Sequence, residues 1–249
     1  MAKLKGILKI EGTLDELTFY KTQDGHLVKT KGGVSAERIA NDPNFQRTRE
    51  NGAEFGSSAT AGKLLRNAVR NLMMNAADSR VTSRLTQIMT QIKNYDTTSA
   101  RGERTVAIGI ADPAALALLK DFDFNENAAL GGVLFAPFNV TGATGAINIP
   151  AFVPINDIAY PSGSTHISLK SAYAVVDFAN GTSAIEYSPV TNLPIDGTNT
   201  PVTLTPAAVP AGAGTKFYLM LIEFFQEVNG VQYSLKNGAY NVLNIVEAA

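Results

Sequence analysis

The chain has 249 residues, of which 45% are hydrophobic and 17% charged, so it is long enough to bury a core and too apolar to be disordered. It has no Cys and only His26 and His166 as imidazoles, which excludes disulfides and thiolate sites and leaves little material for a zinc site or a Ser-His-Asp triad. Residues 1–110 hold 17 Lys+Arg against 11 Asp+Glu, whereas residues 111–249 hold 4 against 11. Halves of opposite charge suit head-to-tail contacts between copies of the chain.

The first 33 residues predict a small β-meander. Residues 5–10, 17–21 and 26–31 favour strands, and Asp24-Gly25 between the last two is a strong hairpin signal, because glycine accepts the positive φ of the turn. Three strands with little apolar area are only marginally stable alone. We favour a sheet that lies on the helices of its own chain, and an exchangeable arm that pairs with a neighbouring subunit stays open as the sharper alternative.

Helix-capping signals follow the meander. Gly32-Gly33 ends it, and Ser35 can cap a short turn that runs to residue 39. Asp42-Pro43 predicts the start of a helix over residues 43–55, because proline is favoured at the first helical position. Gly56 offers a stop, and Ser57 or Ser58 can cap the next helix.

Residues 61–77 predict an amphipathic helix around which the chain is organised. Its apolar residues recur at helical spacing: Ala61, Leu64, Leu65, Ala68, Val69, Leu72, Met73 and Ala76. The opposite face carries Lys63, Arg66 and Arg70. Residues 81–92 repeat Val81, Leu85, Ile88, Met89 and Ile92 at the same spacing, so the two helices are expected to bury their stripes against each other.

The segment after this helical hairpin is mixed. Residues 95–103 are polar and predict a loop, residues 105–110 predict a strand, and Asp112-Pro113 repeats the cap-plus-proline signal before a short helix. Residues 120–125 alternate apolar with polar, and we expect helical character to end there.

From residue 128 onward, Pro, Gly, Thr, Ser and Asn punctuate short apolar runs, which is typical of an all-β sandwich or barrel. The predicted strands are residues 133–138, 146–150, 166–170, 173–178, 183–187, 201–204, 216–227, 231–235 and 240–246. Residues 216–225 are apolar at almost every position, which indicates a central strand covered on both faces. Asn229-Gly230 and Asn237-Gly238 predict the turns of a three-stranded meander that ends the chain.

Three N-terminal stretches carry a resemblance: KGILKIEGTLDELTFYKTQDGHLVKTKGGVS, DPNFQRTRENGAEFG and GKLLRNAV. Over about residues 3–75 the chain resembles an uncharacterised protein family of Bacteroidota. That family has no established activity, so the resemblance implies no catalytic or binding residues here.

The sequence holds no recognisable reaction site. Asp15-Glu16 and Asp121 with Asp123 are carboxylate pairs, but carboxylates that are neighbours on a turn or strand edge are usually solvated. The catalytic and nucleotide-binding patterns GxSxG, HExxH, GxxxxGK[ST] and GxGxxG do not occur. We therefore expect no enzyme and no catalytic, cofactor or metal site. The basic set Lys63, Arg66, Arg70, Arg47, Arg49, Arg80 and Arg84 suggests either a phosphate-binding face or a solvated helix face, and we favour the second.

These features predict an α+β fold in which residues 1–125 form a basic β-meander and helical region and residues 126–249 an acidic, immunoglobulin-like antiparallel β-sandwich. The function we expect is a non-enzymatic structural subunit that assembles with itself into a filament, tube or other multimer. The hypothetical interface comprises Leu17, Phe19, Leu27, Val28, Lys63, Arg66 and Arg70.

The alternatives are a sandwich module that binds a carbohydrate or protein through its loops and, least favoured, a nucleic-acid-associated protein. We expect no cofactor, and the sequence identifies no small-molecule ligand. The sequence shows no secretory signal and no membrane span, so the cytoplasm is the default location, with leaderless export left open.

Overall fold

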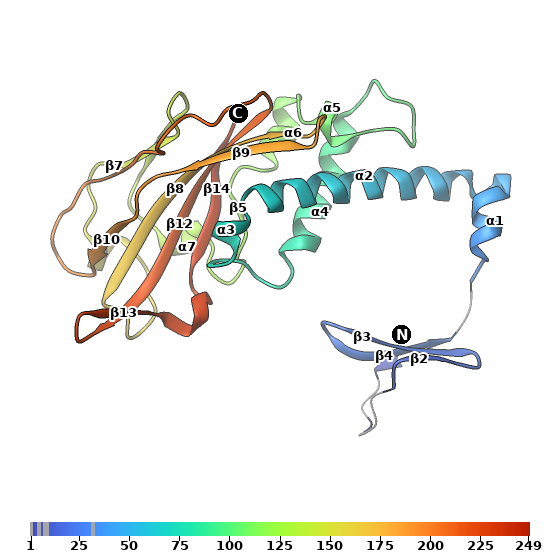
Figure 1. Cartoon of the computed structure of the whole chain (residues 1–249), viewed down its shortest axis with the longest axis horizontal. Coiled ribbons are helices and arrows are strands. Elements are labelled where there is room, and N and C mark those ends of the chain that lie inside the picture. The colour runs from blue at the N-terminus through green and yellow to red at the C-terminus, as the bar shows by residue number, and fades with distance from the viewer. Residues whose placement is uncertain (1, 4–5, 7–9, 31–32) are drawn as a thin grey trace. The chain divides into compact units, whose positions relative to one another are not determined.

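The computed structural model describes residues 2–3, 6, 10–30 and 33–249, and the chain divides into two compact units, Met1–Arg49 and Glu50–Ala249 (Figure 1). The first unit is a small sheet followed by short helical turns. The second unit contains both hydrophobic cores.

The first unit contains a four-stranded antiparallel sheet in the order β1-β4-β3-β2. Its strands are β1 (Ala2–Lys3), β2 (Gly12–Leu14), β3 (Leu17–Thr22) and β4 (Gly25–Thr30). The predicted hairpin is confirmed: Thr22 pairs with Gly25, whose φ of +108° is one that glycine tolerates. The strand predicted over residues 5–10 lies largely outside the described residues.

One face of this sheet carries apolar side chains that are exposed or only half-buried. The cross-strand pairs Leu14 with Leu17 and Phe19 with Val28 place these four side chains on the same face, which we call the arm face. Leu14 is 61% exposed and Leu17 is 41% exposed. Among the residues that the structure describes in this unit, none is buried.

The helical turns of the first unit follow the predicted caps. Ser35 accepts a hydrogen bond from the Arg38 amide at the start of α1 (Ala36–Asn41), and Asp42 accepts one from the Asn44 amide at the start of η1 (Pro43–Phe45). Both predicted caps are confirmed.

The helix break predicted at Gly56 is wrong, because α2 runs without interruption from Gln46 to Ala68. Ser58 donates to the Glu54 carbonyl at 2.8 Å and Thr60 donates to the Gly56 carbonyl at 3.0 Å, so these hydroxyls bond back within the helix and do not cap a new one. The helix also ends earlier than predicted, at Ala68, and a separate turn, α3 (Arg70–Met73), follows it.

The remaining helices of the second unit are α4 (Val81–Ile92), η2 (Lys93–Tyr95), α5 (Val106–Gly109), α6 (Pro113–Ala117), α7 (Leu130–Val133), α8 (Pro154–Asp157) and η3 (Leu235–Gly238). The predicted helix over residues 81–92 is confirmed, and its stripe shares a core with that of α2. The strand predicted over residues 105–110 is wrong, since Thr105 caps α5 there. A Cβ on Gly109 would lie 2.2 Å from the Ile92 carbonyl oxygen, so this glycine lets α5 approach the end of α4 closely.

A seven-stranded antiparallel sheet lies at the centre of the second unit, in the order β10-β8-β12-β14-β5, with β9 also beside β8 and β13 also beside β12. Its strands are β5 (Phe122–Asp123), β8 (His166–Asp177), β9 (Thr182–Tyr187), β10 (Thr191–Pro194), β12 (Thr215–Val228), β13 (Val231–Ser234) and β14 (Val242–Ala248). The prediction of a central strand is confirmed: alternate residues of β12 enter the two cores.

The two cores lie on opposite faces of this sheet. Helices α2 to α6 contribute to the core that contains Phe217 and Leu219. The core on the other face contains Tyr218 and Met220 and is covered by a three-stranded sheet of β6 (Asn139–Thr141), β7 (Ala146–Ile149) and β11 (Val202–Leu204). A helical layer, a central sheet and a small sheet therefore stack in that order, which confirms a mixed α and antiparallel β fold.

Two further strand predictions are wrong. Residues 133–138 do not form a strand, because α7 occupies Leu130–Val133 and the Asp123 carboxylate accepts the Leu130 amide at 2.9 Å. The last three strands do not form a simple meander either, since β13 pairs only with Phe225–Val228 of β12 and leaves Phe217–Ile222 to pair with β14. The two strands predicted over residues 166–170 and 173–178 form one strand, β8, which ends at Asp177.

Candidate functional site

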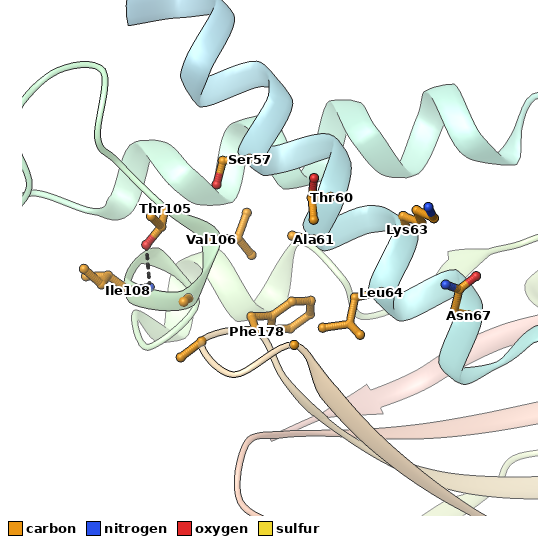
Figure 2. A pocket seen from close by; sticks show the side chains of 13 residues that line it. Ser57, Thr60, Ala61, Lys63, Leu64, Asn67, Thr105, Val106, Ile108 and Phe178 are labelled. Carbon is orange, nitrogen blue, oxygen red and sulfur yellow. Dashed lines mark hydrogen bonds between the residues drawn. The ribbon is translucent and has the colours of Figure 1, made fainter.

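A groove of about 620 Å³ lies on the second unit where α2, α5 and the turn between β8 and β9 meet (Figure 2). Its lining residues are Ser57, Thr60, Ala61, Lys63, Leu64 and Asn67 from α2, Thr105 to Ile108 from the α5 region, and Phe178, Ala179 and Gly181 from the turn. The groove is therefore built from three separate segments, of which α2 and the turn are more than 100 residues apart in the sequence.

The floor of the groove is apolar. Phe178 packs edge-to-face on the buried Phe217 ring, with 6.3 Å between the ring centroids, and the side chains of Leu64 and Phe178 lie close together in Figure 2. Ile108 also lines the groove and is 45% exposed. The side formed by α2 carries the polar residues Lys63 and Asn67, so the groove combines an apolar floor with a few polar side chains.

A second depression, of about 350 Å³, shares Ala107, Phe178 and Ala179 with the groove. It extends to Gly214 and to the last residue, Ala249. The apolar surface around Phe178 therefore continues past the turn toward the end of the central sheet.

A buried ion cluster fixes α2 to the loop that leads into α5. Glu54 is 1% exposed and accepts hydrogen bonds from Arg104 at 2.8 and 3.0 Å, from the Gly102 amide at 2.8 Å, and from Lys93. The hydrogen bonds from Arg104 are the main reason that the pKa of Glu54 falls to about 2. Both carboxylate oxygens are occupied, so the cluster acts as a structural anchor for one wall of the groove.

Asp96 organises the same loop from inside. Burial alone would raise the pKa of this carboxyl, but hydrogen bonds from Ser99, Thr105 and Thr98 hold the pKa below its ordinary value. The Thr105 amide donates to Asp96 at 3.0 Å, which positions the residue that caps α5. Asp96 and Glu54 thus hold in place the loop that forms the α5 side of the groove.

The apolar residues of the predicted interface lie in the first unit. Leu17, Phe19 and Val28 belong to the arm face, whereas Leu27 pairs with Tyr20 and lies on the opposite face. The sheet geometry therefore groups three of these four residues together.

The basic residues of the predicted interface lie in the second unit, and they differ in environment. Lys63 is exposed and lines the groove, and Arg70 is exposed on α3. Arg66 is half-buried, and burial lowers the pKa of its guanidinium. Its Nη1 atom has no hydrogen-bond partner among the described residues.

Other charged residues singled out in the sequence are engaged within the molecule. Arg49 donates to the carbonyls of Ile39 and Asp42 at 2.7 and 3.0 Å, and Arg84 contacts Asp78 and donates to the Asp123 carbonyl at 2.7 Å. These contacts occupy the guanidinium donors that would bind a phosphate. The residues that the structure describes contain no group of three or more His, Asp or Glu that could hold a metal ion.

The comparisons with known proteins place the chain in no group. No family model, no curated protein and no solved structure matches it. Within the described part of the chain, every helix is too short or too polar to cross a bilayer. The candidate site therefore depends on its geometry alone.

Sequence reasoning missed the groove and the anchor beneath it. Phe178 stood at the end of a predicted strand, and Ile108 lay within residues 105–110, which we predicted as a strand. Glu54 and Arg104 are 50 positions apart with no recognisable motif between them, so no local signal connects them. Of the residues that line the groove, Lys63 alone belongs to the interface predicted from the sequence.

Proposed function

We propose that this chain is a non-enzymatic structural subunit that assembles with copies of itself into a filament, tube or other multimer through head-to-tail contacts. The first unit acts as an arm that a neighbouring copy covers. Enzymatic chemistry has no part in this function.

The observation that carries the proposal is the uncovered apolar arm face. Small domains bury too little surface to be stable unless something staples or covers them, and isolated two- or three-stranded sheets are marginal in water. The arm face exposes Leu14 and Leu17, and no described residue of the unit is buried. Burying such side chains against a partner contributes about 1.5–3 kcal/mol each when burial is complete.

Charge supports contacts between unlike surfaces. The first unit has 9 Lys+Arg against 6 Asp+Glu, whereas the second has 12 against 16. A basic arm and an acidic body attract when they belong to different copies, and repeated contacts of this type produce rings or open helices.

Two finer expectations belong with this proposal. An immunoglobulin-like sandwich is supported by the two antiparallel sheets that share a core, although helices cover the other face of the larger sheet. Membership of an uncharacterised Bacteroidota family is supported by the N-terminal stretches quoted above.

The test is electron microscopy and light scattering of the full chain at a series of concentrations. We expect regular multimers that Phe19→Asp abolishes, because this substitution places a charge on the arm face. Thr18→Asp is the matched control, since its side chain is on the opposite face of the same strand. A uniform 26.4 kDa particle at every concentration would overturn the proposal.

A ligand-binding module is the second candidate, and the groove is the observation that favours it. Its volume of about 620 Å³ falls within the range of small-molecule sites, and its apolar floor has a few polar groups at the rim. An apolar fluorescent dye should bind the monomeric protein, and Phe178→Ala should weaken that binding. Equal binding by both proteins would remove this candidate.

A further inference from the structure

The central sheet of the second unit has an open edge at β9. This strand pairs with β8 on one side only. In an antiparallel pair, every second residue directs its N–H and C=O groups toward the partner strand. The Ser188 amide donates to the Ser171 carbonyl of β8 at 3.0 Å, so the even-numbered residues of β9 face β8. The backbone groups of Ser183, Ile185 and Tyr187 therefore point away from β8.

Most of these outward groups have no partner among the described residues. The Tyr187 carbonyl accepts the Ala207 amide at 3.0 Å, so a loop covers that end of the strand. The N–H and C=O groups of Ser183 and Ile185 are in no hydrogen bond within the described part of the chain. Unpaired groups in a row are a template for another strand.

The sequence of β9 does little to protect this edge. Proteins usually protect an exposed edge with Lys, Pro, a bulge or a very short strand. β9 has six residues, Thr-Ser-Ala-Ile-Glu-Tyr, and contains neither Lys nor Pro. Its one charged residue is Glu186, which favours a basic partner.

The open edge adjoins the apolar groove. Phe178, Ala179 and Gly181 line the groove, and they belong to the turn that leads directly into β9. Ile185 packs against the same core as Leu64. A strand added to β9 would therefore lie next to an apolar surface that its own side chains could cover.

The first unit offers a strand that fits this edge. Among the residues that the structure describes, β2 pairs with β3 alone and is an edge of the sheet β1-β4-β3-β2, and it carries the exposed Leu14. The unit is basic, and its apolar arm face needs a cover. These features match the unpaired backbone, the acidic residue and the apolar groove beside β9.

We propose that β2 of one copy pairs along β9 of a second copy, so that the small sheet of the arm extends the central sheet of the neighbour. The inference rests on the self-assembly proposed above and names the surface that receives the arm. Backbone hydrogen bonds supply the register, and the arm face covers the groove around Phe178.

The absence of Cys makes a cross-linking test direct. Thr13→Cys and Ser183→Cys are prepared as separate full-length proteins, mixed at assembling concentration and treated with a short bismaleimide. We expect a cross-linked dimer that contains one copy of each. Thr13→Cys mixed with Ser234→Cys, which lies on β13, is the control and should give little product.

A second variant tests the edge itself. The Ser183 amide points away from β8, so Ser183→Pro removes an outward donor and keeps the β8 ladder. We expect it to raise the concentration needed for assembly by about tenfold, with Ser183→Thr unchanged and both melting like the parent.

The outcomes separate the two proposals. If the chain assembles but the Thr13–Ser183 product is absent and Ser183→Pro assembles normally, the β9 edge is wrong and self-assembly stands. If the double variant Thr13→Cys/Ser183→Cys cross-links only within one chain, β2 covers its own body and the exchange is wrong. If no multimer forms at any concentration, both proposals fail.

Discussion

The two units of this chain both contain antiparallel strands, but among the described residues the buried side chains all lie in the second. In the central sheet, β12 presents Phe217 and Leu219 to a helical layer and Tyr218 and Met220 to a second sheet, and all four are fully buried. In the first unit, β3 presents Phe19 to a face that nothing in its own unit covers completely.

This difference shows that strand formation and strand burial are separate problems. A hairpin such as that of β3 and β4 needs only a turn and β-favouring residues, which the sequence supplies locally. A core needs a second layer to face the sheet. The second unit contains its own layers, whereas no described residue of the first unit is buried, and we propose that a second copy supplies the missing layer.

The largest effect should come from matched substitutions of one phenylalanine in each unit. Phe217→Ala removes a fully buried ring from the central strand and should destabilise the second unit by about 3–5 kcal/mol. Phe19→Ala, in dilute protein, should change the free energy of unfolding by less than about 0.5 kcal/mol. Urea unfolding of both variants checks this, and equal losses would contradict the comparison.

The buried anchor should produce the next largest effect. Glu54→Gln leaves Lys93 and Arg104 without their carboxylate. It should lower the free energy of unfolding by about 3 kcal/mol, because breaking a buried ion pair leaves an uncompensated buried charge. Glu50→Gln is the control, since Glu50 pairs at 3.4 Å with Arg101, whose side chain is 49% exposed. This substitution should lower the free energy of unfolding by at most about 1 kcal/mol. Thermal unfolding of the two variants gives the ranking.

The same carboxylate should make the second unit sensitive to acid. The pKa of Glu54 is lowered from 4.5 to about 2 in the folded protein, so its stabilising contribution is present above pH 4.5 and is lost as the pH falls toward 2. The urea midpoint of the parent should therefore fall more steeply over this range than that of Glu54→Gln. Parallel curves would show that Glu54 does not carry the effect.

Substitutions of two turn glycines, one in each unit, should give the smallest difference in stability. Gly230 has a φ of +75° in the turn between β12 and β13, and Gly25 has a φ of +108° in the arm hairpin. Gly230→Ala should destabilise the second unit by about 1 kcal/mol, because a side chain is strained at positive φ. Gly25→Ala should leave the melting of the second unit unchanged, and calorimetry can compare them.

Much of the fold could be predicted from sequence because its signals are local. The caps at Ser35, Asp42 and Asp112, the helix at Val81–Ile92 and the central strand β12 all depend on residues close together in the chain. The errors at Gly56 and at residues 105–110 have tertiary causes. Buried contacts of Glu54 accompany the helix that continues through Gly56, and the close approach of Gly109 to Ile92 accompanies a helical turn where a strand was expected.

The candidate site was harder to predict than the fold. The arm face could be anticipated in part, because Leu17, Phe19 and Val28 follow the strand period. The groove could not be anticipated, since it brings Leu64, Ile108 and Phe178 together from three separate elements. The open edge of β9 depends on which strands become neighbours, and a single sequence does not specify that order.

The most direct test of the central claim is hydrogen exchange of the β3 and β4 amides, Leu17–Thr30, in the full chain at low and at assembling concentrations. If another copy covers the arm, these amides should exchange rapidly in dilute protein and become protected as the multimer forms, while β12 stays protected throughout. Protection of the β3 and β4 amides that is equally strong at every concentration would contradict the account, because the arm would then be stable without a second copy.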